Sequence, residues 1–233
     1  MVNSHTRIKM CGLWREEDIV CANMILPDYI GFVFAPSTRQ VSKDSARVLK
    51  DKLTQEILAV GVFVQECEEM IVELAKEGII DIIQLHNSFT DEGRDKQAYN
   101  ERETKIARLR TKTNIPIIKA VGVYDANSII AQQHSCADWI LLDNTRGGSG
   151  ECFLWDHITK AKEMGFSRAF FLAGGLNADN LNDALHLAPF GIDLSKGLES
   201  NGTKDCAKMR TVADIIRTHD SKSPPLKDRR VLF

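Results

Sequence analysis

The segment Trp139-Ile-Leu-Leu-Asp-Asn-Thr-Arg-Gly-Gly-Ser-Gly150 joins an apolar run to a glycine-rich turn. A short apolar run is typical of a buried parallel strand, and Asp143 lies where this run stops. Because ligands bind at the carboxyl ends of the strands in α/β folds, the Asp143 carboxylate is predicted to face a binding site. The three glycines allow a tight turn that brings backbone N–H groups close to an anion. A glycine-rich turn with a helix-capping acid is the structural alternative.

The length and composition of the chain fit one large α/β domain or two small ones. Its 233 residues include 43% hydrophobic side chains, enough to bury a sizeable core. The 30 basic and 32 acidic residues are mixed along the chain, and the net charge is −2, so there is no basic surface for nucleic acid or anionic lipid. No apolar run approaches the roughly 18 residues of a membrane span, and the N-terminus has no signal-like segment. A cytoplasmic protein is therefore expected.

The cysteine spacing gives no support for a metal or a dithiol site. The six cysteines, at positions 11, 21, 67, 136, 152 and 206, form no CxxC pair and no zinc-like pattern with histidine. A cytosolic environment would keep them reduced. Most are expected to be small buried hydrophobic residues, as free cysteines usually are.

Apolar runs alternate with charged amphipathic segments about eight times, as in a closed (β/α)8 TIM barrel. The predicted strands are 7–11, 29–34, 57–64, 81–86, 115–121, 139–143, 168–173 and 191–195. Predicted helices include 42–53, with Ser42 as the N-cap, and 177–187, which begins with Asn177. We expect one barrel domain over residues 1–220 and a frayed C-terminal tail over 221–233.

The two-residue period of the strands places three reactive side chains at one mouth of the barrel. Ile8 and Met10 should face the helices, so Lys9 and Cys11 point into the barrel. The same reasoning turns His86 and Asp143 inward. Each residue also has a structural alternative: a core-filling cysteine, a packed histidine and a capping acid. Their convergence on one mouth favours a functional site.

Ordered motifs at nearly every strand end resemble one family. They are Lys9-Met-Cys-Gly12, Gly31-Phe-Val-Phe34 with Pro36-Ser-Thr-Arg-Gln-Val-Ser42, Val60-Gly-Val-Phe-Val64, Gln84-Leu-His86, Ile118-Lys-Ala120, Leu141-Leu-Asp143 with Gly147-Gly-Ser-Gly150, Ala173-Gly-Gly-Leu-Asn177 and Asp193-Leu-Ser-Lys-Gly-Leu-Glu199. In order and spacing, the chain is similar to the phosphoribosylanthranilate isomerases of tryptophan biosynthesis. The resemblance runs from residue 7 to about residue 217.

This resemblance implies a cofactor-free Amadori rearrangement of a small-molecule substrate, N-(5-phosphoribosyl)anthranilate. By similarity, Asp143 is the general acid that protonates the ring oxygen, and Cys11 is the general base that removes the C2 proton. A free thiol with a pKa of about 8.5 is mostly protonated at neutral pH, and a free aspartic acid with a pKa of about 3.9 is mostly ionised. The mechanism therefore predicts pKa shifts of opposite sense for the two groups.

The remaining site residues are also taken from the resemblance. Arg39 is expected to bind the anthranilate carboxylate, although a solvated loop arginine is the alternative. His86 is expected to neighbour the substrate, and Asp193 to contact its sugar or amine. The phosphate is expected to bind, with no metal or other cofactor, among Gly148, Ser149, Gly150, Gly174, Gly175, Ser195 and Gly197. The sequence leaves open whether the protein is a monomer or a homodimer.

Three features depart from the family pattern. Lys196 stands where a small residue is common, so it either adds a positive charge to the phosphate site or points away. Asn87 replaces a glycine after the strand that ends at His86. The next connection is unusually long, and its charged part, 90–102, is expected to be a solvated surface extension rather than a lid.

Two other classes of function stay open at this point. One is another phosphosugar barrel enzyme, such as a related aminoaldose isomerase with a carboxylate at the end of its first strand, or the indole-glycerol-phosphate synthase, which relies on lysines. Cys11 argues against both. The other is a non-catalytic phosphate-binding barrel, and the set of Cys11, Arg39 and Asp143 argues against it.

Overall fold

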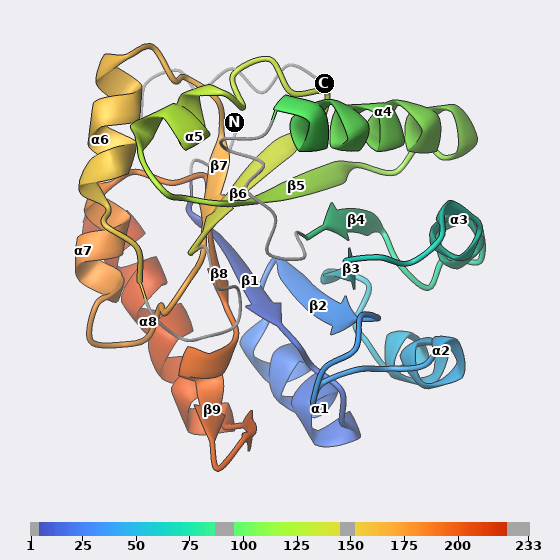
Figure 1. The fold of residues 1–233 in the computed structure, drawn as a ribbon. Coiled ribbons are helices and arrows are strands. Elements are labelled where there is room, and N and C mark those ends of the chain that lie inside the picture. Colours follow the sequence, from blue (N-terminus) through green and yellow to red (C-terminus); the bar gives the residue numbers. More distant parts are fainter. Residues whose placement is uncertain (1–4, 87–95, 145–151, 223–233) are drawn as a thin grey trace.

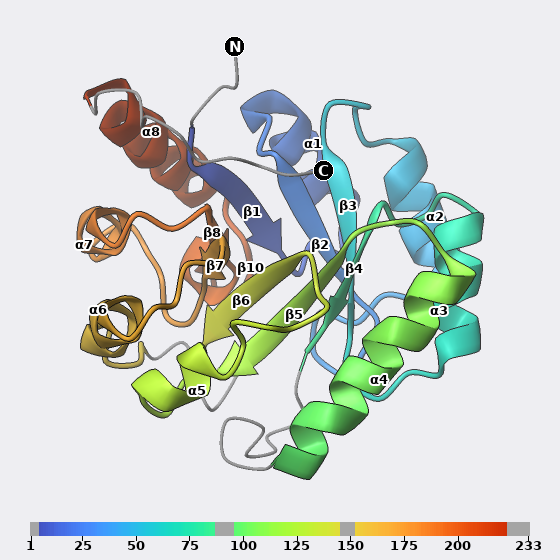
Figure 2. The ribbon, with the colours of Figure 1, turned by 90° about the horizontal axis from the view of Figure 1, so that it is seen from above.

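Eight parallel strands close into a barrel in the order in which they occur in the sequence. In this computed structural model, residues 5–86, 96–144 and 152–222 are described. The strands are β1 (Arg7–Cys11), β2 (Tyr29–Val33), β3 (Leu58–Phe63), β4 (Ile82–Leu85), β5 (Ile117–Gly122), β6 (Trp139–Asp143), β7 (Phe170–Leu172) and β8 (Gly191–Leu194). Figure 2 shows them ringed by helices, so the predicted (β/α)8 barrel is confirmed.

The helices lie outside the strands, as Figure 1 shows from the side. They are α1 (Glu16–Ile25), α2 (Lys43–Asp51), α3 (Glu68–Lys76), α4 (Lys96–Lys112), α5 (Ala126–Ile130), α6 (Asp156–Glu163), α7 (Leu181–His186) and α8 (Cys206–Lys222). A 3-10 turn, η1 (Lys196–Leu198), and a hairpin of β9 (Glu199–Ser200) and β10 (Thr203–Lys204) lie between β8 and α8. Helix α8 takes up the first two residues of the expected tail, and the others, 223–233, lie outside the described residues.

Local side-chain hydrogen bonds influence where two of the predicted helices begin. The Ser42 hydroxyl accepts a hydrogen bond from the N–H of Ser45, which confirms Ser42 as the N-cap of α2. Helix α7 starts at Leu181, four residues after the predicted start. The Asn177 side chain accepts a bond from the N–H of Asp179, and this local turn competes with helix formation.

The alternation of side chains along the strands separates two apolar layers. Ile8 and Met10 belong to the larger layer, between the sheet and the helices. The smaller layer fills the barrel itself and consists of Tyr29, Val60, Ile82, Ile118, Ala120, Leu141, Phe171 and Ala173. The predicted inward and outward faces of β1 and β6 are therefore confirmed, and the inward positions at the strand ends remain for polar groups.

The charged connection before β5 differs in part from the predicted solvated extension. Its residues 90–95 lie outside the described residues, and the rest begins helix α4. Arg102 donates hydrogen bonds to the backbone carbonyls of His86, at 2.7 Å, and Ala120, at 3.2 Å. The Tyr99 ring lies 4.0 Å from the buried Lys119 Nζ. The prediction was wrong for Tyr99 and Arg102, because α4 packs both against the ends of β4 and β5.

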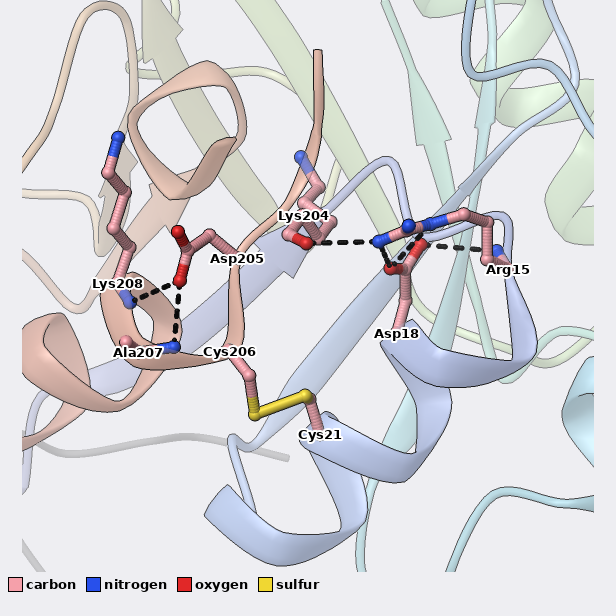
Figure 3. Close-up of a disulfide and its surroundings, with 8 residues drawn as sticks. All are labelled: Arg15, Asp18, Cys21, Lys204, Asp205, Cys206, Ala207 and Lys208. Atoms are coloured by element: carbon pink, nitrogen blue, oxygen red, sulfur yellow. Dashed lines mark hydrogen bonds and ion pairs between the residues drawn. A yellow bond between two sulfur atoms is a disulfide. The ribbon is translucent and has the colours of Figure 1, made fainter. Parts of the chain in front are cut away.

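The cysteines also differ from the prediction. Cys21 of α1 and Cys206 of α8 form a disulfide, although 185 residues separate them in sequence (Figure 3). Because β1 pairs with β8 where the barrel closes, the helices α1 and α8 come together. The Cα atoms of the two cysteines are 5.6 Å apart, a distance suited to a disulfide. Three free cysteines are exposed: Cys67, Cys136 and Cys152. The prediction of mostly buried, reduced thiols was therefore wrong.

Candidate active site

A cavity of about 520 Å³ opens at the carboxyl ends of the strands. All five of the predicted catalytic and substrate-binding residues line it: Cys11, Arg39, His86, Asp143 and Asp193. They come from the ends of β1, β4 and β6, from β8 and from the loop after β2. Side chains that are far apart in the sequence thus face one space large enough for a small molecule.

The described part of the predicted phosphate site lies in the same cavity. Gly174, Gly175, Ser195 and Gly197 all line it, in the loops after β7 and β8. The N–H groups of Gly174 and Gly175 make no hydrogen bond to any described residue, so they are available to an anion. Lys196 also lines the cavity. The predicted positions Gly148, Ser149 and Gly150 lie outside the described residues.

Cys11 ends β1 and is buried at the cavity floor. Burial raises the pKa of its thiol, and the nearby Asp193 carboxylate acts in the same direction. The ammonium groups of Lys9 and Lys204 oppose this effect without overcoming it. The mechanism taken from the sequence requires a lowered thiol pKa, so the direction that burial sets is the reverse of the prediction.

Lys9 and Asp193 form a buried ion pair at the wall of the cavity, which Asp193 lines. The Lys9 Nζ lies 2.8 Å from the Asp193 Oδ1, and the lysine side chain is fully buried. Burial raises the pKa of Asp193 while Lys9 opposes the rise. The pKa of Lys9 is raised because Asp193 and Cys11 together outweigh its burial. The strand period signalled an inward Lys9, but only barrel closure shows that its partner comes from β8.

Three contacts position the Asp143 carboxylate at the end of β6. Its Oδ1 accepts a hydrogen bond from the N–H of Asn144 at 2.7 Å, and its Oδ2 lies 3.3 Å from the His86 Nε2. Gly174 has a φ of 83°, and a Cβ atom there would lie 2.8 Å from the Asp143 Oδ1. Since the next helix begins only at Asp156, Asp143 caps no described helix. Glycine is therefore required beside the carboxylate, and the capping alternative is not supported.

Arg39 is held by a residue that the sequence analysis gave no role. Its Nε and Nη2 atoms donate to the two carboxylate oxygens of Glu199 at 2.5 and 2.9 Å. Glu199 also accepts from the Lys204 Nζ at 2.7 Å, and the same Nζ donates to the carbonyl of Ser195. The alternative of a solvated loop arginine was wrong. Glu199 closes the quoted β8 motif, which was the only sequence signal for it.

The described part of the chain shows neither a metal-binding cluster nor a membrane-spanning helix. Among residues 5–86, 96–144 and 152–222, no group of three or more His, Cys, Asp or Glu side chains is arranged to hold a metal ion. Over the same residues, no helix is both long and apolar enough to cross a membrane.

Comparison with known proteins identifies relatives along almost the whole chain. Residues 8–214 match the family model described as N-(5'phosphoribosyl)anthranilate (PRA) isomerase. The N-(5'-phosphoribosyl)anthranilate isomerase of Endomicrobium trichonymphae is 39% identical over 217 residues, which cover 91% of this chain and 98% of the relative. That of Clostridium kluyveri is 36% identical over 212 residues, with the same coverage of both chains.

Solved structures of similar proteins agree with these relatives. The Thermus thermophilus phosphoribosyl anthranilate isomerase has a TM-score of 0.76 and 29% identity, covering 92% of this chain and all of its own. A second isomerase, in complex with reduced 1-(o-carboxyphenylamino)-1-deoxyribulose 5-phosphate, has a TM-score of 0.73 and 28% identity, covering 91% and 99%. The family model, the relatives and the fold coincide, and the chain belongs to the N-(5'-phosphoribosyl)anthranilate isomerase family.

Proposed function

We propose that this chain isomerises N-(5'-phosphoribosyl)anthranilate to 1-(o-carboxyphenylamino)-1-deoxyribulose 5-phosphate in tryptophan biosynthesis, with Cys11 as the base and Asp143 as the acid. The observation that carries the proposal is the shared cavity of Cys11, Asp143 and Arg39 in a member of this family. A related aminoaldose isomerase would have a carboxylate where β1 ends in Cys11. A barrel that only binds phosphate would need neither the acid nor the base.

Asp143 and Cys11 carry the two proton transfers. The protonated Asp143 carboxyl donates its proton to the furanose ring oxygen, and the C1–O bond breaks to give a Schiff base. The Cys11 thiolate then removes the proton from C2, and the electron pair of that C–H bond moves to form an enolamine. The enolamine tautomerises to the aminoketose. Because only protons and electron pairs within the substrate move, the proposed reaction uses no cofactor.

Further groups that line the cavity hold the substrate against the acid and the base. The N–H groups of Gly174 and Gly175 bind the phosphate, with Ser195 and Gly197 on the neighbouring loop. Gly148, Ser149 and Gly150 complete this phosphate site. The Arg39 guanidinium binds the anthranilate carboxylate. His86 neighbours the substrate, and Asp193 contacts its sugar or amine.

Cations beside Cys11 support its role as a base. Lys9 lies on the same face of β1, two residues before Cys11, and Lys204 also acts on the thiol. Both positive charges favour the thiolate against the effect of burial. The base is therefore a small thiolate population, stabilised by two neighbouring cations.

Location, domain extent and assembly state complete the proposal. The protein acts in the cytoplasm as a single catalytic domain over residues 1–220, as a monomer or a homodimer. One similar structure is of monomers generated from a dimeric isomerase of Thermotoga maritima. Light scattering of the protein as it elutes from a size-exclusion column gives its molar mass, which distinguishes a monomer from a homodimer.

A fluorescence assay of phosphoribosylanthranilate consumption tests the activity. Wild-type protein is expected to consume the substrate, and Asp143→Asn and Cys11→Ser variants to lose turnover. Glu73→Gln serves as a control, because Glu73 pairs with Lys43 on the outer surface and is remote from the cavity. A folded wild-type protein that binds ribose 5-phosphate without turnover would instead indicate a non-catalytic barrel.

A further inference from the structure

The contacts around Arg39 leave one edge of its guanidinium group unused. A guanidinium has two edges that can bind a carboxylate through two hydrogen bonds: one formed by Nε and Nη2, the other by Nη1 and Nη2. Glu199 occupies the first edge through both of its oxygens. The Nη1 atom makes no hydrogen bond to any described residue. Arg39 lines the cavity, whereas Glu199 is not among its described lining residues.

Glu199 is itself fixed more firmly than a surface carboxylate. Its side chain is only 7% exposed, and Lys204 donates to the same Oε1 atom that accepts from the Arg39 Nε. Lys204 stands opposite Glu199 in the β9–β10 hairpin. The pKa of Glu199 is lowered, because its bonds to Arg39 and Lys204 outweigh its burial. The carboxylate therefore stays ionised and keeps two bonds to the guanidinium at neutral pH.

The hairpin that carries Glu199 and Lys204 is anchored to the first helix. The Arg15 Nη2 donates to the carbonyl of Lys204 at 2.9 Å and to the buried Asp18 carboxylate at 2.6 Å (Figure 3). Cys206, two residues after Lys204, is joined to α1 by the disulfide with Cys21. The backbone that follows Glu199 is thus joined to α1 at two points, Lys204 and Cys206.

Gly12, directly after β1, lies against the Arg39 side chain. Gly12 follows Cys11, and a Cβ atom at Gly12 would lie 2.6 Å from the Arg39 Cδ. The aliphatic part of the Arg39 side chain therefore passes close to the backbone beside the proposed base, where glycine leaves room for it. Glu199 then sets the rotation of the guanidinium group.

We infer that Glu199 is a positioning and specificity-determining residue: it takes the Nε–Nη2 edge of Arg39 so that the Nη1–Nη2 edge faces the cavity and selects a substrate with a carboxylate on its aromatic ring. Lys204 completes the device, since it joins Glu199 to the carbonyl of Ser195 in the phosphate loop. The inference rests on the proposed function, because it takes the carboxylate of the proposed substrate as the ligand of Arg39.

The test compares two ligands in wild-type, Glu199→Gln and Glu199→Asp proteins. Reduced 1-(o-carboxyphenylamino)-1-deoxyribulose 5-phosphate carries the ring carboxylate, and ribose 5-phosphate lacks it. We expect Glu199→Gln to weaken binding of the carboxylated analogue about tenfold, as for the loss of one charged hydrogen bond, and ribose 5-phosphate by less than about twofold. Glu199→Asp keeps the charge but is one methylene shorter, so a similar selective loss is expected.

Kinetics give a second readout that a merely structural role would not produce. KM for phosphoribosylanthranilate should rise about tenfold in Glu199→Gln, while kcat changes less than about threefold. In an Arg39→Met background the same Glu199 substitution should cause no further loss, because it acts through Arg39. Glu73→Gln, which removes an exposed carboxylate from an outer ion pair, should change neither constant.

Three results would overturn the inference. They are equal weakening of both ligands, unchanged binding in both Glu199 variants, and an effect of Glu199→Gln that adds fully to that of Arg39→Met. If the wild-type protein turns over its substrate and one of these results is found, the inference fails while the proposed function stands. If the wild-type protein has no turnover, the proposed function fails, and the two-ligand comparison still decides whether Glu199 orients Arg39.

Discussion

Cys11 and Asp143 are held in different ways, although both line one cavity. On the β8–β1–β2 side, Cys11 lies near the titratable side chains of Lys9, Asp193 and Lys204. On the β4–β6 side, the Asp143 carboxylate is held by the N–H of Asn144 and by His86. A buried thiol needs cations to favour its anionic form, whereas a fixed backbone can position a carboxyl group. Neighbouring charges therefore act mainly on the proposed base, and hydrogen bonds mainly position the proposed acid.

The largest effect on catalysis is expected from substitution of Cys11, the proposed base. Cys11→Ser should lower kcat by about 10⁴-fold or more, because a hydroxyl is a far weaker acid than a thiol and yields almost no anion at neutral pH. Stability, measured by urea denaturation, should stay within about 1 kcal/mol of wild type, since little volume is removed. Cys11→Asp should restore part of the rate. An active serine variant would assign proton abstraction elsewhere, with His86 the next residue to test.

Asp143→Asn should lower turnover by about 10²–10⁴-fold while binding of the product analogue is retained. Its pH dependence separates the two sides of the cavity. Without the acid, the residual rate depends on the Cys11 thiolate alone, so it should rise about tenfold per pH unit up to the thiol pKa. Burial raises that pKa, so the rise should continue beyond about pH 8.5, the ordinary thiol value. A residual rate that is constant from pH 7 to 8.5 would contradict the assignment of Cys11.

A smaller effect is expected from Asp193→Asn. The Asp193 carboxylate raises the pKa of Cys11, so its neutralisation should lower that pKa and increase the thiolate fraction at neutral pH. The rate of alkylation of Cys11 by iodoacetamide at pH 7 should rise about threefold to tenfold, in line with a shift of up to one pKa unit. Cys11→Ser provides the background rate from the other thiols. Unchanged or slower alkylation would mean that Asp193 does not set the charge state of the base.

The disulfide should have the smallest effect on catalysis and a clear effect on stability. It joins residues 185 apart, so opening it releases a long loop in the unfolded chain, and a loss of about 2–4 kcal/mol is expected. The Cys21→Ser/Cys206→Ser double variant should match reduced wild-type protein in urea denaturation and keep kcat. A lower kcat would show that the contact between α1 and α8 influences the part of the cavity that holds Cys11.

Much of the site could be predicted because its members occupy regular positions on strands. The two-residue period turned Cys11, His86 and Asp143 inward, and each stands where a strand ends or directly after it. The start of α7 was placed four residues early, because the Asn177 side chain makes a turn of its own. Local hydrogen bonds of that kind depend on the backbone path, which periodicity does not give.

The eight-fold alternation, the faces of the strands and the side chains offered to the mouth of the barrel follow from sequence patterns a few residues long. Which charges meet depends on the tertiary structure. Arg39 and Glu199 are 160 residues apart, and Lys9 and Asp193 are 184 apart. Such pairs form only where closure of the barrel sets β8 beside β1 and brings Glu199, at the start of the β9–β10 hairpin, to Arg39. Burial then fixes the thiol pKa, because the dielectric surroundings of a group depend on every element packed around it.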